Sequence, residues 1–168
     1  WEEKEEPAVR DCASMELWWE RYGEELSVVV DRPGWVISLQ YRPAERIACK
    51  EFTNGWGRPE FHDRAEVLRA TEHYVLRLLP KKKRPGGFDD PLLPDDGWPE
   101  TLEVIGEDTV PSAFSHVEAM PSSLPYRSVL LGFDRPQDGA DRSVVPRDEE
   151  GLWGGDVVFR WRPGAFLR

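Results

Sequence analysis

Three histidines are the side chains in this sequence that could perform acid–base or metal chemistry. His62 and His73 do not have the i, i+4 spacing that would place two imidazoles on one metal ion. His116 adjoins Ser115, with Ser112 nearby, but neighbouring residues rarely aim a hydroxyl at an imidazole, and no glycine elbow surrounds either serine. The sequence therefore predicts no catalytic centre, no metal site and no cofactor.

Carboxylates gather between residues 85 and 108, a stretch with eight acids and no base. Four of them form two adjacent pairs, Asp89/Asp90 and Asp95/Asp96. Oxygen clusters of this kind suit Ca²⁺ or Mg²⁺, but the spacing is not that of a known calcium loop. We therefore favour solvated loop charge or an acidic patch that faces a protein partner.

Eight tryptophans are present in 168 residues, where average composition would give roughly two. A tryptophan brings a large rigid apolar face and one N–H donor, which suits an interface. Three lie in expected helix or strand and are predicted to be core: Trp18, Trp35 and Trp161. Three lie in loops beside glycine or proline, as loop anchors or exposed contacts: Trp56, Trp98 and Trp153.

The formal net charge is −10. A negative field repels phosphate backbones, so we expect no nucleic acid partner, and it would steer a basic protein towards the chain. No apolar run of ~18 residues is present, so no membrane span is expected. Cys12 and Cys49 are too few for a disulfide framework, and we expect free thiols in a cytoplasmic protein.

The first half of the chain predicts a helix followed by a meander. Residues 1–13 are expected to form a loose acidic tail, and a short helix through Met15 to Tyr22 should be capped by Asp11 or Ser14 and end at Gly23. Three antiparallel strands should follow: Leu26–Val30, Trp35–Tyr41 after a turn at Asp31–Gly34, and Glu45–Phe52.

The segment Asp63–Leu79 predicts the best-defined helix. Asp63 and Glu66 have the spacing of a capping pair. Its apolar stripe contains Leu68, Thr71, Val75, Leu78 and Leu79. Its solvent face contains Glu66, Arg69, His73 and Arg77.

Further strands are expected at Thr101–Ile105, Arg127–Phe133 and Asp156–Trp161, between two long polar loops. With no linker that divides the chain, these elements predict a single α+β domain over residues 14–168. We expect antiparallel sheet packed with two main helices.

The order of these elements resembles that of the immunity proteins of actinobacterial polymorphic toxins, of the type that neutralises the mycobacterial NAD-glycohydrolase toxin. The likeness covers residues 14–135 and rests on the Gly-ended helix with Trp and Tyr, the meander, Arg64-Ala65-Glu66 through Tyr74, an Arg-Pro-Gly turn and Leu93-Pro94. The resemblance implies a cytosolic, non-enzymatic inhibitor that binds a toxin domain tightly and blocks its substrate cleft.

We therefore expect a protein-binding inhibitor in which acidic loop side chains enter a basic cleft and a loop tryptophan fills the adjacent pocket. The predicted contact residues are Asp89, Asp90, Asp95, Asp96, Trp98, Glu107, Asp108 and Trp56. The alternative is a barrel or cup that binds a small ligand and is lined by tryptophan.

Overall fold

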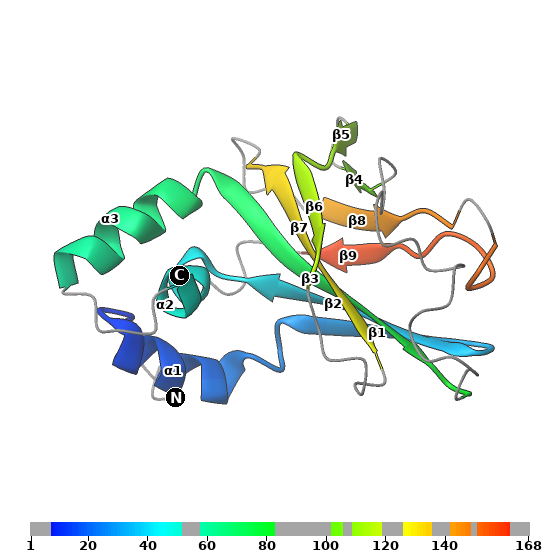
Figure 1. Ribbon diagram of the computed structural model, residues 1–168, viewed down its shortest axis with the longest axis horizontal. Coiled ribbons are helices and arrows are strands. Elements are labelled where there is room, and N and C mark those ends of the chain that lie inside the picture. The colour runs from blue at the N-terminus through cyan, green and yellow to red at the C-terminus, as the bar shows by residue number, and fades with distance from the viewer. Residues whose placement is uncertain are drawn as a thin grey trace, which may run out of the picture.

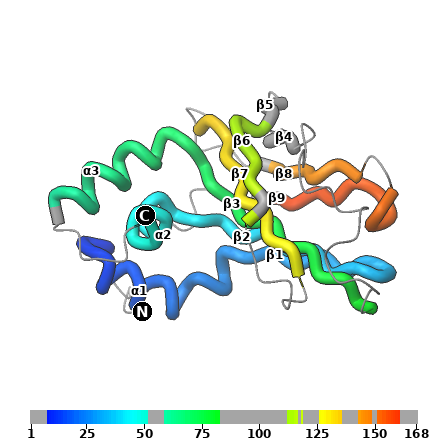
Figure 2. Tube along the Cα trace, viewed as in Figure 1, coloured from blue at the N-terminus to red at the C-terminus, as the bar shows by residue number. Residues whose placement is uncertain are grey.

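The computed structural model describes residues 8–51, 58–82, 102–105, 109–118, 126–135, 142–148 and 151–161. They form three helices and two antiparallel sheets, which confirms the expected α+β class. The helices are α1 (Cys12–Tyr22), α2 (Ala44–Glu51) and α3 (Arg58–Leu68). All three lie at one end of the larger sheet, and the smaller sheet lies towards the other end (Figures 1 and 2).

Helix α1 begins and ends as its sequence predicts. The Asp11 carboxylate accepts a hydrogen bond from the Ser14 amide at 2.8 Å, and the Ser14 hydroxyl accepts one from the Asp11 amide at 3.0 Å, so two free donors of the first turn are satisfied. Gly23 follows the helix with helical φ, so its role is steric. A Cβ at Gly23 would lie 2.8 Å from the Trp19 ring, which places the indole flat against the chain there.

The hairpin of β1 (Ser27–Arg32) and β2 (Trp35–Arg42) confirms the first two predicted strands. Arg32 pairs directly with Trp35, so Pro33 and Gly34 alone make the turn. Proline presets its own φ, and Gly34 takes a φ of +123° that a side chain would disfavour.

The helix predicted over Asp63–Leu79 is wrong beyond Leu68 and also in its start, because α3 begins at Arg58 and Asp63 lies inside it instead of capping it. Helix α3 ends at Leu68, Arg69 and Ala70 turn, and β3 runs over Thr71–Pro80. Leu68, Val75 and Leu78 are buried as expected, but His73, expected at the solvent face, is buried as well.

The same apolar residues fit both periodicities in this segment. Leu68, Val75 and Leu78 follow a helical stripe, while Tyr74, Leu76 and Leu78 alternate as in a strand. A strand covered on both faces has few polar positions, so its sequence does not alternate clearly. Tertiary pairing with two neighbouring strands decides in favour of β structure.

The predicted third strand, Glu45–Phe52, is also wrong, because residues 44–51 form α2. Ala44 and Ala48 are buried one turn apart and pack with Phe61, Ala65 and Leu68 of α3. Helical spacing of small side chains was the available signal.

The larger sheet has the strand order β1-β2-β3-β7-β6, and every pairing is antiparallel. Here β6 is Phe114–Val117 and β7 is Arg127–Asp134. The smaller sheet has the order β5-β4-β8-β9, with β5 Thr109–Pro111, β4 Leu102–Ile105, β8 Arg142–Pro146 and β9 Phe159–Trp161. Two later predicted strands are therefore confirmed, and the last begins at Phe159 instead of Asp156.

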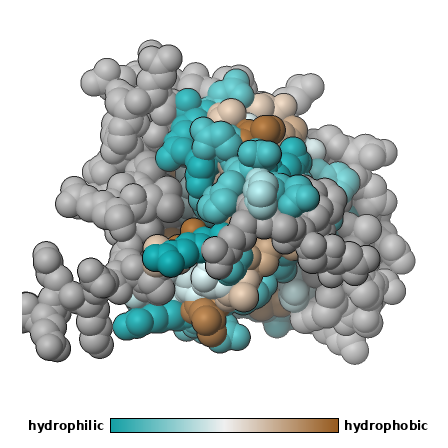
Figure 3. Space-filling view, turned by 90° about the vertical axis from the view of Figure 1, so that its left-hand side faces the viewer, coloured by the Kyte–Doolittle hydropathy of each residue, from teal (hydrophilic) through white to brown (hydrophobic). Residues whose placement is uncertain are grey.

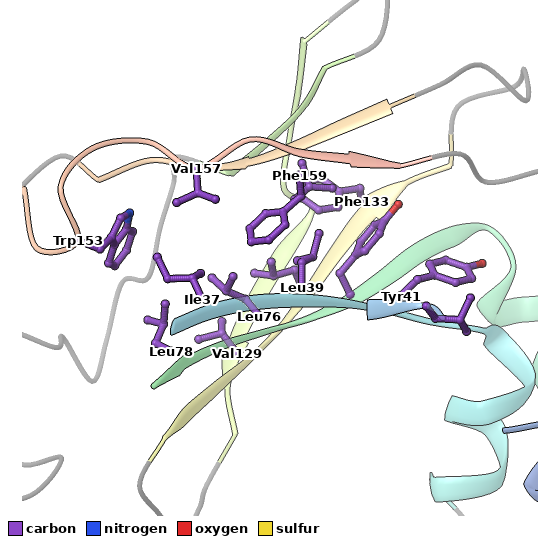
Figure 4. Packing of buried hydrophobic residues seen from close by; sticks show 14 of the residues in the cluster. Ile37, Leu39, Tyr41, Leu76, Leu78, Val129, Phe133, Trp153, Val157 and Phe159 are labelled. Atoms are coloured by element: carbon purple, nitrogen blue, oxygen red, sulfur yellow. The ribbon is translucent and has the colours of Figure 1, made fainter. Parts of the chain in front are cut away.

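The main core lies between the two sheets (Figure 4). Alternate residues of the central strands point into it, among them Ile37 and Leu39 of β2 and Leu76 and Leu78 of β3. From the other side come Val157, Phe159 and Trp153, which close the core beneath the small sheet and its loop.

A disulfide joins Cys12 of α1 to Cys49 of α2, with the Cα atoms 5.4 Å apart. The expectation of free thiols is therefore wrong. With only two cysteines in the chain, spacing alone could not reveal their proximity, which depends on two helices packing side by side. Among the described residues, no helix is long and apolar enough to cross a membrane.

The central strand provides a test of the core. Leu76 is fully buried between β2 and β7. We expect Leu76→Ala to lower the free energy of unfolding by about 2–5 kcal/mol, because it removes packed methyl groups and leaves a cavity. Val29→Ala, at an exposed site of β1, should change it by less than about 0.5 kcal/mol in the same urea titration. Equal losses in the two variants would show that β3 is not the packed centre.

The disulfide provides a second test. It closes a separation of 37 residues, and the chain-entropy relation assigns a loop of this size about 2–4 kcal/mol of stability. Reduction should therefore lower the urea midpoint of the parent chain. The double variant Cys12→Ser/Cys49→Ser should match the reduced parent and should not respond to reductant. An unchanged midpoint after complete reduction would contradict the prediction.

Candidate functional site

The predicted contact residues lie outside the part of the chain that the structure describes. This holds for Asp89, Asp90, Asp95, Asp96, Trp98, Glu107, Asp108 and Trp56. Of the other tryptophans, Trp18 and Trp35 are buried in the main core as predicted, and Trp153 is buried there too. The side chain of Trp161 lies outside the described residues.

The groups considered for catalysis are not brought together. His62 is exposed on α3, whereas His73 is buried on β3. Ser115 and His116 are consecutive residues of β6, so their side chains point to opposite faces of the sheet. Among the described residues, no group of three or more metal-ligating side chains is found.

A different set of charged side chains does converge, at the face of the larger sheet that points away from the small sheet. Strand alternation places Arg42 of β2 and Arg77 of β3 on this second face, since their neighbours Tyr41 and Leu76 point into the core. Ser128 of β7 pairs with Arg77 and lies on the same face.

Helices α1 and α2 bring further groups to this face. The Trp19 ring of α1 receives two guanidinium groups, with the carbons of Arg42 and Arg46 each 5.0 Å from its centroid. Arg46 also makes an ion pair with Glu16 of α1. On the strand side, the Arg77 guanidinium lies 5.4 Å from the centroid of Tyr126. We call Arg42, Arg46, Lys50 and Arg77 the basic cluster.

Electrostatic repulsion acts within the basic cluster. Burial lowers the pKa of Arg42 to about 10, and proximity to Arg77 adds to this shift, while Glu118 opposes it. The pKa of Lys50 is also lowered, first by burial and then by Arg42 and Arg46. Arg42 therefore remains protonated at neutral pH, and the surroundings of both groups favour the cationic form less than water does.

Several donors of the basic cluster have no acceptor. The Nε atoms of Arg42, Arg46 and Arg77 are buried and have no hydrogen-bond partner among the described residues. Arg46 is only 8% exposed, so water reaches little of it. A buried N–H without an acceptor costs free energy, so three in one place require an explanation.

The acids beside the basic cluster are Glu16 and Glu118, and both are exposed. Glu16 binds Arg46, and Glu118 accepts a hydrogen bond from the Ser128 hydroxyl. Within the described chain, no carboxylate forms an ion pair with Arg42 or Arg77. Counting the described residues alone, four cations and two carboxylates leave a local excess of two positive charges.

Local contacts hold the two helices over the second face. Gln40 donates a hydrogen bond from Nε2 to the Gly23 carbonyl at 3.2 Å, which ties the end of α1 to β2. The disulfide and the Glu16–Arg46 ion pair then connect α1 to α2. Seen from the helical end, the described surface is mainly hydrophilic, with separate small apolar patches (Figure 3).

Sequence analysis did not identify the basic cluster. Arg46 and Lys50 are four residues apart, which is the spacing of side chains on one helical face. Because residues 45–52 were predicted to form a strand, the helical spacing of these side chains was not recognised. Arg77 was placed on the solvent face of a helix that does not extend that far.

A buried carboxylate also lies on β3. Glu72 is 2% exposed and accepts a hydrogen bond from the Tyr74 hydroxyl at 3.1 Å. Burial raises the pKa of Tyr74, so the phenol stays protonated and acts as a donor. This pair stabilises the end of the core near Tyr41.

No protein-family model and no curated protein matches the chain. Among solved structures, it is similar to a novel protein of unknown function from Burkholderia pseudomallei K96243. The match has 8% sequence identity and a TM-score of 0.47, and covers 89% of this chain and 84% of that one.

The burial of His73 predicts how the free energy of unfolding changes with pH. Burial lowers its pKa below the ordinary value of 6.5, although Glu51 opposes the shift. Above pH 6.5 both folded and unfolded states hold a neutral ring, so His73 contributes no pH dependence there. As the pH falls below 6.5, the unfolded state takes up the proton more readily, and the free energy of unfolding should decrease.

The measurement is urea unfolding at pH 7.5 and pH 5.5. We expect His73→Gln to reduce the loss of stability between these values relative to the parent. His62→Gln, at an exposed position of α3, should leave that loss unchanged. If His73→Gln and the parent lose the same amount, the buried ring does not control the response.

Proposed function

We propose that this chain is a non-enzymatic protein-binding inhibitor of the immunity type, which captures a basic toxin domain and occludes its substrate cleft. The observation that carries the proposal is the outer surface of α1 and of the turn that follows it. Leu17 and Glu20 share one helical face of α1 and are exposed, and Glu24 and Glu25 are exposed in the turn after the helix.

Leu17 is the apolar centre of this acidic surface and is 68% exposed. Large apolar side chains surrounded by charge are typical of contact surfaces, where the apolar group anchors the complex and the charges guide the encounter. The stretch 85–108, with eight acids and no base, supports a basic partner independently. Like charges destabilise a compact chain slightly, so a complementary partner would account for both concentrations.

The tryptophan-lined cup is less well supported. That alternative needs several indole rings in the wall of a cavity. Trp18, Trp35 and Trp153 instead belong to the packed main core, where they contact sheet residues.

The proposed site of action is the cytoplasm, as the family resemblance implies. Cytoplasmic thiols are kept reduced, so Cys12 and Cys49 would exist there as a dithiol. The inhibitor must then fold and bind without the cross-link, which the Cys12→Ser/Cys49→Ser variant can establish.

The test is binding kinetics with a candidate toxin domain, measured by surface plasmon resonance at low and high salt. Replacing Glu20, Glu24 and Glu25 together by Gln should slow association at low salt and flatten its salt dependence, because steering acts at long range and is screened. Leu17→Ala should instead speed dissociation, because an apolar anchor acts after the encounter.

A matched control changes the same amount of charge elsewhere. The triple variant Glu60→Gln/Asp63→Asn/Asp134→Asn also removes three exposed acids, two from α3 and one from β7. Its association rate should fall less than that of the α1 variant. Identical rates for the two triple variants would mean that α1 is not the contact surface, and absence of binding by the parent would overturn the proposal.

A further inference from the structure

We infer that the basic cluster on the second face of the larger sheet is a binding site for a doubly charged oxyanion, the phosphate group of a small phosphorylated molecule. This inference is independent of the proposed inhibitor function. It rests on three observations: the excess of positive charge, the donors without acceptors, and the way in which the aromatic rings hold the guanidinium groups.

The charge balance of the described residues favours a doubly charged ligand. Four cations come together from β2, β3 and α2, and the neighbouring carboxylates in this part of the chain are Glu16 and Glu118. A single carboxylate would leave half of the excess unbalanced, whereas a phosphate dianion balances it. Arginine is suited to this ligand because its planar fork can donate two parallel hydrogen bonds to an oxyanion.

The basic cluster contains N–H donors of the kind that an oxyanion accepts. Buried Nε–H groups of Arg42, Arg46 and Arg77 have no acceptor among the described residues. A guanidinium that lies over an aromatic ring uses its face for that contact and keeps its N–H groups at the edge for hydrogen bonds. Arg42 lies over Trp19 and Arg77 over Tyr126 in this manner.

The basic cluster is also open to solvent at its margin. Lys50 and Glu118 are exposed, whereas Arg42 and Arg77 are half-buried and Arg46 is buried. An anion can therefore approach past Lys50 and lose most of its water at the arginines. Partial burial strengthens charge-assisted hydrogen bonds, since the surroundings screen them less than bulk water does.

The experiment is isothermal titration calorimetry of the full oxidised chain with inorganic phosphate, with adenosine monophosphate as a phosphate ester and with acetate as a singly charged control. We expect saturable binding of both phosphates and much weaker binding of acetate. Tighter binding of the ester than of free phosphate would assign the site to an organic phosphate, and the reverse order would assign it to the free ion.

Variants distinguish binding at the basic cluster from nonspecific attraction by positive side chains elsewhere in the chain. Arg77→Gln and Arg42→Gln should each weaken phosphate binding about tenfold to a hundredfold, since each removes charge-assisted hydrogen bonds. Arg77→Lys keeps the charge but loses the fork, so an intermediate loss is expected. Arg160→Gln removes an exposed cation from β9 in the small sheet and should leave binding unchanged.

Nuclear magnetic resonance gives a readout that does not depend on a variant folding. The Nε–H signals of Arg42, Arg46 and Arg77 should shift as phosphate is added to the parent chain, and that of Arg160 should not. The inference is overturned if phosphate does not bind saturably at millimolar concentration, if acetate binds equally well, or if Arg160→Gln weakens binding as much as Arg77→Gln.

Discussion

Strict alternation along β3 is the constraint on which both the core and the basic cluster depend. Tyr74, Leu76 and Leu78 point towards the small sheet and are fully buried, so a shift of one residue would turn them away from the main core and turn Arg77 into it. Burying apolar side chains stabilises the fold by roughly 1.5–3 kcal/mol each, which fixes the register. The register then determines that His73, Val75 and Arg77 face the other way. The core therefore positions the charged face through the strand register.

Helices α1 and α2 supply side chains to the basic cluster that the strands of the sheet do not provide. Strand residues alone place Arg42 and Arg77 four pairing rows apart, with Val75 between them in the row of Gln40. Helices α1 and α2 add Trp19 and Arg46 beside Arg42, and the disulfide fixes one helix against the other. The glycine at position 23 allows the indole to lie close to the backbone. A small local requirement, the absence of one Cβ, thereby affects the position of two guanidinium groups.

The sequence predicted elements well where one structural signal dominated. The helix ending at Gly23, the hairpin around Pro33-Gly34 and the buried strand at Arg127 each combine a clear pattern with a clear stop. Prediction failed for residues 45–52 and 71–79, where buried apolar side chains fit helix and strand alike. Pro43 precedes α2, but no glycine or proline marks the change from α3 to β3. The basic cluster was missed for the same reason. Its four cations come from three elements, and the spacing of Arg46 and Lys50 places them on one face only once α2 is known to be a helix.

Charge acts on two length scales in this molecule. The net charge of −10 acts on a partner at a distance and favours a partner with a basic surface. Within the basic cluster the local excess is positive, and distant acids contribute little there because mobile ions screen them beyond ~8 Å at physiological ionic strength. A basic protein approaching the acidic face of α1 and an oxyanion entering beside Lys50 would therefore respond to different fields. Helix α1 carries Glu20 outward and Trp19 towards Arg42. It is thus the element that the two proposed surfaces share.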